Sequence, residues 1–190
     1  MGDRTQRALV MALVSALSCG GCSSSLSLQQ QEPAPATIST VVVGSIVADD
    51  ADHQREVRRF RRALAHDLQE TGAFETVITT PPALLPADAV LVTGHVHRIG
   101  DGSETLRFAV GSGAGAPRLR VRVQVFDVNG VRLAAFAQSA RSFDGTGYSA
   151  HWSPIYLDDL VDELAEQTAD AIVRWREGRP IDAEFWEDWF

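Results

Sequence analysis

Residues 118–127 read Arg-Leu-Arg-Val-Arg-Val-Gln-Val-Phe-Asp, the most regular period-two stretch of the chain. Successive side chains of a β-strand point to opposite faces of its sheet, so strict alternation gives a strand two different faces. This pattern predicts an antiparallel strand with one buried and one solvated face. The apolar set is Leu119, Val121, Val123 and Val125, and the polar set is Arg118, Arg120, Arg122 and Gln124.

A turn signal follows this strand directly. Asn129-Gly130 separates it from a second apolar run over 131–143. Both residues accept a positive φ, which a two-residue type I′ hairpin turn requires. The stretch therefore predicts a β-hairpin, which places an antiparallel pair of strands at the centre of the fold.

Hydrophobic periodicity predicts further elements on both sides of the hairpin. A helix over 51–71 carries one apolar stripe and stops at Gly72, which tolerates a positive φ. Strands are predicted over 38–47, 74–79, 89–99 and 106–110, and a last helix over 154–177. The order strand, helix, strands, helix predicts an α+β two-layer sandwich, with both helices packed on one face of a mostly antiparallel sheet.

The amino terminus has the pattern of an export signal. Arg4 and Arg7 precede an apolar run over 8–17, which is too short to span a bilayer but suits a signal peptide. Small residues then lead to Cys19 and Cys22, as in the lipobox of bacterial lipoproteins. We favour Cys22 as the lipidated residue, because serines follow it; Cys19 and a disulfide between the two cysteines are the alternatives.

These signals divide the chain into four parts. We expect a signal peptide and lipobox over 1–22, a flexible tether over 23–37, one globular domain over 38–177 and an acidic, aromatic tail over 178–190. The net charge of −8 argues against nucleic-acid binding, which needs a basic surface. All 17 basic residues are arginine, which excludes lysine Schiff-base chemistry.

The segment 107–115, Arg-Phe-Ala-Val-Gly-Ser-Gly-Ala-Gly, precedes the hairpin. With the strands before and after it and the closing helix, it resembles an uncharacterised family of bacterial lipoproteins over most of 37–176. The architecture is also similar to the periplasmic domain of the curli-secretion lipoprotein and to the N-terminal domain of TolB. The resemblance implies an envelope location and this fold, and it leaves any activity open.

Three groups of residues are candidate sites. Glycine loops bind phosphate when a helix follows, but here a strand follows Gly111, Gly113 and Gly115, which favours a bulge over a binding loop. His95 and His97 share one strand face and, with His151, form a possible metal-ligand set; we expect surface histidines and no metal or cofactor. Ser149 and His151 lack an acidic partner, so we expect no catalytic residues.

Two charged or aromatic segments are candidate contact surfaces. A helix face with five arginines is expected to be solvated and paired with acidic residues such as Glu56, with anionic lipid or an acidic partner as the alternative: Arg55, Arg58, Arg59, Arg61 and Arg62. The acidic tail contains four aromatic residues, which we expect to dock either on the domain itself or on a partner: Phe185, Trp186, Trp189 and Phe190.

The sequence therefore predicts a non-enzymatic lipoprotein that interacts with another envelope protein. Neither cysteine is followed by aspartate, so we expect the outer membrane, on its periplasmic side. The alternative is a lipoprotein that binds a small ligand or a cell-wall glycan through the glycine loop.

Overall fold

The computed structural model describes residues 23–100, 118–141 and 157–179. Two helices, α2 (Gln54–Glu70) and α4 (Leu157–Arg176), and a short 3-10 turn, η1 (Ala51–His53), accompany a sheet. The strands are β1 (Ser23–Gln31), β2 (Thr40–Ala48), β3 (Thr76–Ile78), β4 (Ala89–Gly100), β5 (Arg118–Phe126) and β6 (Arg132–Arg141).

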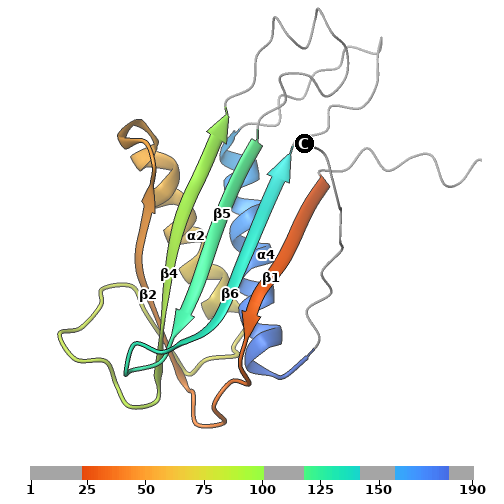
Figure 1. The fold of residues 1–190 in the computed structure, drawn as a ribbon. Coiled ribbons are helices and arrows are strands. Elements are labelled where there is room, and N and C mark those ends of the chain that lie inside the picture. Colours follow the sequence, from red (N-terminus) through yellow and green to blue (C-terminus); the bar gives the residue numbers. More distant parts are fainter. Residues whose placement is uncertain (1–22, 101–117, 142–156, 180–190) are drawn as a thin grey trace, which may run out of the picture.

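The strands form one mixed sheet in the order β1-β6-β5-β4-β2-β3. Neighbours from β1 to β4 pair antiparallel, whereas β2 pairs parallel with both β4 and β3. In Figure 1 the strands cross the molecule side by side, and β1 begins at the end of the sheet where β4 finishes. This arrangement confirms the predicted α+β sandwich with a mostly antiparallel sheet.

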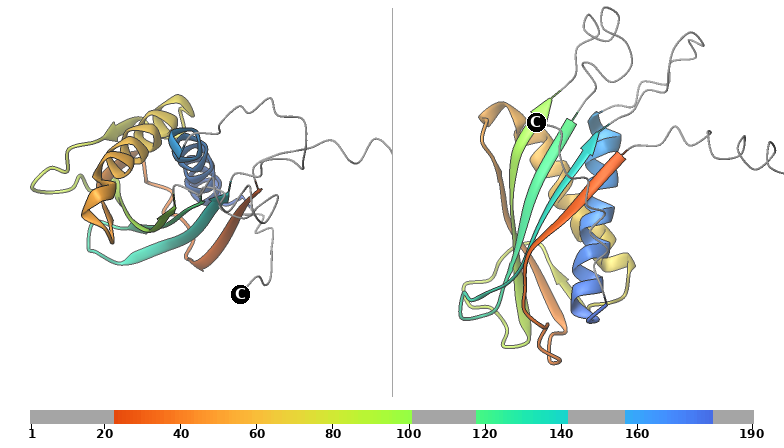
Figure 2. Two further views of the ribbon diagram at one scale, coloured as in Figure 1. Left: turned by 90° about the horizontal axis from the view of Figure 1, so that it is seen from above. Right: turned by 45° about the vertical axis from the view of Figure 1, so that its right-hand side comes forward.

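Both helices cover the same face of the sheet and lie beside each other, as the two views of Figure 2 show. The apolar stripe of α2 buries Val57, Phe60, Leu64 and Leu68, as its spacing predicts. The inward side chains of β5 meet α4 in the same core, where Trp175 is fully buried. Neither helix of the described part has an apolar run long enough to cross a membrane.

The ends of the first helical segment have the chemistry expected of caps. The Asp50 carboxylate accepts a hydrogen bond from the Asp52 backbone N–H at 2.9 Å, which satisfies a free amide at the start of η1. Gly72, just after α2, has φ of 63°, which a side chain would disfavour. The predicted start and stop of this helical segment are thus confirmed within a few residues.

The β5–β6 hairpin is confirmed, but the two central residues of its turn are not the predicted Asn129 and Gly130. The Gly130 N–H donates to the Asp127 carbonyl at 3.1 Å, so Val128 and Asn129 are the central residues of the turn and Gly130, with φ of 79°, follows them. The Asp127 carboxylate accepts from the backbone N–H groups of Asn129 and Val131, at 2.9 Å and 2.7 Å. These bonds draw the turn one residue earlier than the Asn-Gly pair alone suggests.

The prediction of a flexible tether over 23–37 is wrong for its first nine residues. Residues 23–31 form β1, which pairs along its length with β6 at the sheet edge. The physical reason is the alternation Ser25-Leu26-Ser27-Leu28, a period-two pattern within a serine-rich segment. The backbone N–H of Glu32 continues the pairing with a 2.7 Å hydrogen bond to the Leu133 carbonyl.

Candidate functional site

The sheet face that the helices leave uncovered carries the polar side chains of β4 and β5. Arg120 and Arg122 are exposed on β5, and His95 and His97 lie on β4, each with 37% of its side chain exposed. His95 stands directly opposite Arg122 in the antiparallel register. The face is therefore basic, although the whole chain is acidic.

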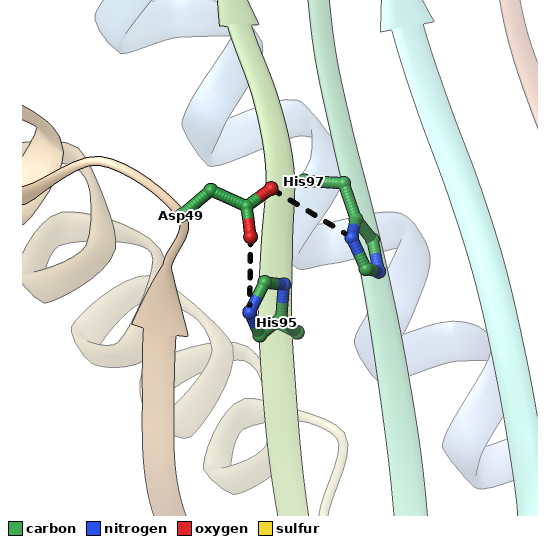
Figure 3. A group of neighbouring side chains, drawn as sticks. All are labelled: Asp49, His95 and His97. Carbon is green, nitrogen blue, oxygen red and sulfur yellow. Dashed lines mark ion pairs between the residues drawn. The ribbon is translucent and has the colours of Figure 1, made fainter.

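Asp49 joins the two histidines from the neighbouring strand (Figure 3). β2 runs parallel to β4 with Val47 opposite His95, and the Asp49 backbone N–H donates to the Val96 carbonyl at 3.3 Å. The Asp49 carboxylate consequently reaches both rings. Its Oδ1 lies 3.4 Å from His95 Nε2, and its Oδ2 lies 3.9 Å from His97 Nδ1. The two imidazole centroids are 4.5 Å apart.

Two irregularities in strand pairing border this cluster. The β4–β5 register shifts between Val96 and Arg98, so His97 is the extra residue of a bulge. The β2–β4 register also shifts, between Val43 and Ile46. Bulges re-aim side chains and are common beside functional sites. Here they coincide with the point where three potential ligands converge.

The surroundings favour a neutral imidazole at His97. Partial burial lowers the pKa of His97, and the nearby His95 and Arg122 lower it further, while the Asp49 carboxylate acts in the opposite direction. Arg120 adds another positive charge. At neutral pH His97 therefore offers a free nitrogen lone pair, which a protonated ring lacks.

The second histidine has one usable ring nitrogen. The Nδ1 atom of His95 is buried and has no hydrogen-bond partner among the described residues. Its Nε2 atom faces Asp49. Two imidazole nitrogens and one carboxylate thus converge within 4.8 Å of one another, a donor set that divalent transition metals accept.

The sequence placed His95 and His97 together correctly but did not include Asp49. The expected third residue, His151, lies outside the described residues, as do Ser149 and the glycine loop of Gly111, Gly113 and Gly115. Cys19, Cys22 and the aromatic tail residues Phe185, Trp186, Trp189 and Phe190 also lie outside them. Asp49 could not be included from the sequence, because only the parallel pairing of β2 with β4 brings this residue, which directly follows β2, beside His97.

Arg55 and Arg59 of α2 bind acidic residues of α4, which corrects the prediction of a solvated face for these two, whereas Arg58 and Arg62 are exposed. Arg59 donates two hydrogen bonds to Asp162 of α4, from Nε at 2.8 Å and from Nη2 at 2.5 Å, and one to Asp158 at 2.8 Å. Arg55 also binds Asp158 at 2.8 Å. The hydrogen bond to Asp162 is the main reason that the pKa of Arg59 is raised. Arg61 binds the carbonyls of Val43 and Thr79.

Two other polar clusters have structural explanations. Asp88 joins the beginnings of β2 and β4, because its carboxylate accepts from the hydroxyls of Ser39 and Thr40, and these bonds lower its pKa. A shallow acidic groove lies between the two helices, where burial is the main cause that raises the pKa of Asp67. Its lining is Ala63, His66, Asp67, Asp162, Glu163 and Glu166.

Comparisons with known proteins agree on the fold. Residues 27–146 match the family model of a domain of unknown function, DUF4410. A dodecamer of a PelC variant from Paraburkholderia phytofirmans is 16% identical with a TM-score of 0.50, over 76% of this chain and 95% of that one. A DUF330 protein from Xanthomonas campestris is 9% identical with a TM-score of 0.50, over 80% and 94%. No curated protein matches the chain.

Proposed function

The chain belongs to the DUF4410 family, a domain of unknown function, and we propose that it is a lipid-anchored protein of the bacterial envelope. In this proposal it binds another protein and catalyses no reaction. The observation that carries this proposal is the uncovered sheet face. The helices bury one face of the sheet, and the other presents Arg120 and Arg122 to solvent. Such a charged, rigid surface suits docking, and its occupant is an acidic surface of an envelope protein.

The export signal and the position of β1 support the anchor. β1 begins at Ser23, the residue after Cys22, so a lipid on Cys22 attaches at the edge of the sheet without a spacer. The nine residues of β1 extend about 30 Å from that point. The anchored end would then be the end that carries Asp49 and His97, and the β5–β6 hairpin would face away from the membrane.

A similar fold is known to assemble. The PelC structure from Paraburkholderia phytofirmans is a dodecamer, so a domain with this architecture has surfaces that bind protein subunits. This supports a binding role for the present chain. We propose the outer membrane, on its periplasmic side, as the location, because neither Cys19 nor Cys22 is followed by aspartate.

Replacement of Cys22 by serine is expected to move the protein from the membrane fraction to the soluble fraction, because the acyl chains supply the anchoring free energy at about 0.8 kcal/mol per buried CH₂. Cell fractionation and mass spectrometry of the mature amino terminus measure this. Cys19→Ser is the matched control and should remain acylated and in the membrane. Retention of Cys22→Ser together with release of Cys19→Ser would assign the lipid to Cys19.

The docking face is tested by cross-linking in the natural host. A photoreactive amino acid at Gln124, on the uncovered face, should give one dominant cross-linked protein, and Arg120→Glu with Arg122→Glu should abolish it by charge repulsion. The control position is Arg62, exposed on α2. Cross-linking from Arg62 alone, or an unchanged yield from the charge-reversed protein, would refute a docking role for this face.

A further inference from the structure

Independently of that role, we propose that Asp49, His95 and His97 form a binding site for a divalent transition metal ion, Zn²⁺ above all. The three ligands come from the end of β2 and from β4, which are neighbours in the sheet (Figure 3). One ligand atom from each of the three residues lies within 4.8 Å of the other two.

The donors lie near the spacing that tetrahedral coordination requires. Zinc bonds to nitrogen and oxygen are about 2.0–2.1 Å long, so two ligands of a tetrahedral zinc ion lie about 3.4 Å apart. His95 Nε2 and Asp49 Oδ1 are already 3.4 Å apart. His97 Nδ1 lies 3.9 Å from the other carboxylate oxygen, Oδ2. One ligand atom from each of the three residues lies within 4.8 Å of the others, so side-chain rotation must draw the donors together around the ion.

Protons and a metal cation compete for the same ligand atoms, and nearby charges also act on the cation. A ligand must be neutral imidazole or carboxylate to bind, and protons compete with the metal otherwise. Arg122 stands opposite His95 in the strand register, and Arg120 is exposed on the same strand. The two arginines repel a cation, but they also favour an anion as the fourth ligand, which offsets part of that repulsion.

The donor set selects the class of metal. Two of the three ligands are imidazoles, which suit zinc, nickel and copper, whereas Mg²⁺ and Ca²⁺ take oxygen ligands. Three protein ligands leave a fourth position open, as in zinc sites that bind water or an exogenous group. With Asp49 60% exposed on its side chain, the position is reachable from solvent.

The test uses the processed, lipidated protein in detergent, purified with a tag that lacks histidine. Calorimetric titration with Zn²⁺ at pH 7.5 should give one site per chain. Each of Asp49→Asn, His95→Gln and His97→Gln should weaken that site by about tenfold or more, because each removes one ligand. His66→Gln is the matched control, since His66 is an exposed histidine on α2 beside the acidic groove.

A second measurement separates coordination from loose surface binding. Co²⁺ in place of Zn²⁺ should give the visible absorption of a tetrahedral cobalt site, absent from His97→Gln and undiminished by excess Mg²⁺. The affinity for Zn²⁺ should fall as pH is lowered through the histidine range, because protons then occupy the ligands. Absence of zinc binding at micromolar concentration, or equal binding by wild type and the three ligand variants, would overturn the proposal.

Discussion

Replacement of Trp175 by alanine is expected to lower the free energy of unfolding by about 3–5 kcal/mol, the range for a large aromatic side chain removed from a core. Trp175 is fully buried in the last turns of α4 and belongs to the core shared by the helices and the sheet. Most domains are stable by only about 5–15 kcal/mol, so this loss would remove a large share of the total. Equilibrium urea unfolding, followed by far-ultraviolet circular dichroism, measures the change.

The same side chain also ties the helix to the chain that follows β1. Its Nε1 donates a hydrogen bond of 2.8 Å to the Glu32 carbonyl. Trp175→Phe retains an aromatic ring but removes this donor, so we expect a smaller loss, of about 1–3 kcal/mol. If both variants unfold at the same urea concentration as the wild type, α4 does not contribute to the core in the way the buried ring indicates.

Local patterns predicted most of the elements because each carries its own signal. The three- and four-residue steps of Val57, Phe60, Leu64 and Leu68 require only that one helix face be buried, and all four side chains are buried. The alternation in β5 likewise predicts which side chains face the core. Element type follows from such short-range periodicity without knowledge of the neighbours.

Strand pairing between distant segments could not be predicted in the same way. The parallel pairing of β2 with β4 joins segments that α2 and β3 separate in sequence, and no residue in either strand specifies its partner. This pairing brings Asp49 beside His95 and His97, so the candidate site depends on it. The pair of histidines was visible in the sequence, whereas their carboxylate was not.

Charge patterns were ambiguous for a related reason. A run of arginines on α2 has the same appearance whether it faces solvent or a second helix. The parallel packing of α4 beside α2 decides the matter, because it places Asp158 and Asp162 opposite Arg55 and Arg59. Similarly, Ser25-Leu26-Ser27-Leu28 has the composition of a linker, and only an available edge on β6 makes it a strand.

A polar pair is buried between α4 and β6. The hydroxyl of Thr168, which is fully buried, is hydrogen-bonded to the side-chain oxygen of Gln138, which is 3% exposed. The Thr168 hydroxyl also lies 2.7 Å from the Leu164 carbonyl, one turn earlier in the helix. Gln138 belongs to the sheet and Thr168 to the helix, so the pair joins the two layers inside an otherwise apolar core.

Thr168→Val keeps the shape of the side chain but leaves the Gln138 oxygen buried without its donor. We expect a loss of about 1–3 kcal/mol in the free energy of unfolding, which is the desolvation penalty of an unsatisfied polar group. Gln138→Leu alone should cost less, because Thr168 retains the Leu164 carbonyl as a partner. The double variant should therefore be more stable than the sum of the single changes predicts, by about 1 kcal/mol. Strict additivity in urea unfolding would show that the two side chains contribute independently and that their hydrogen bond does not couple the helix to the sheet.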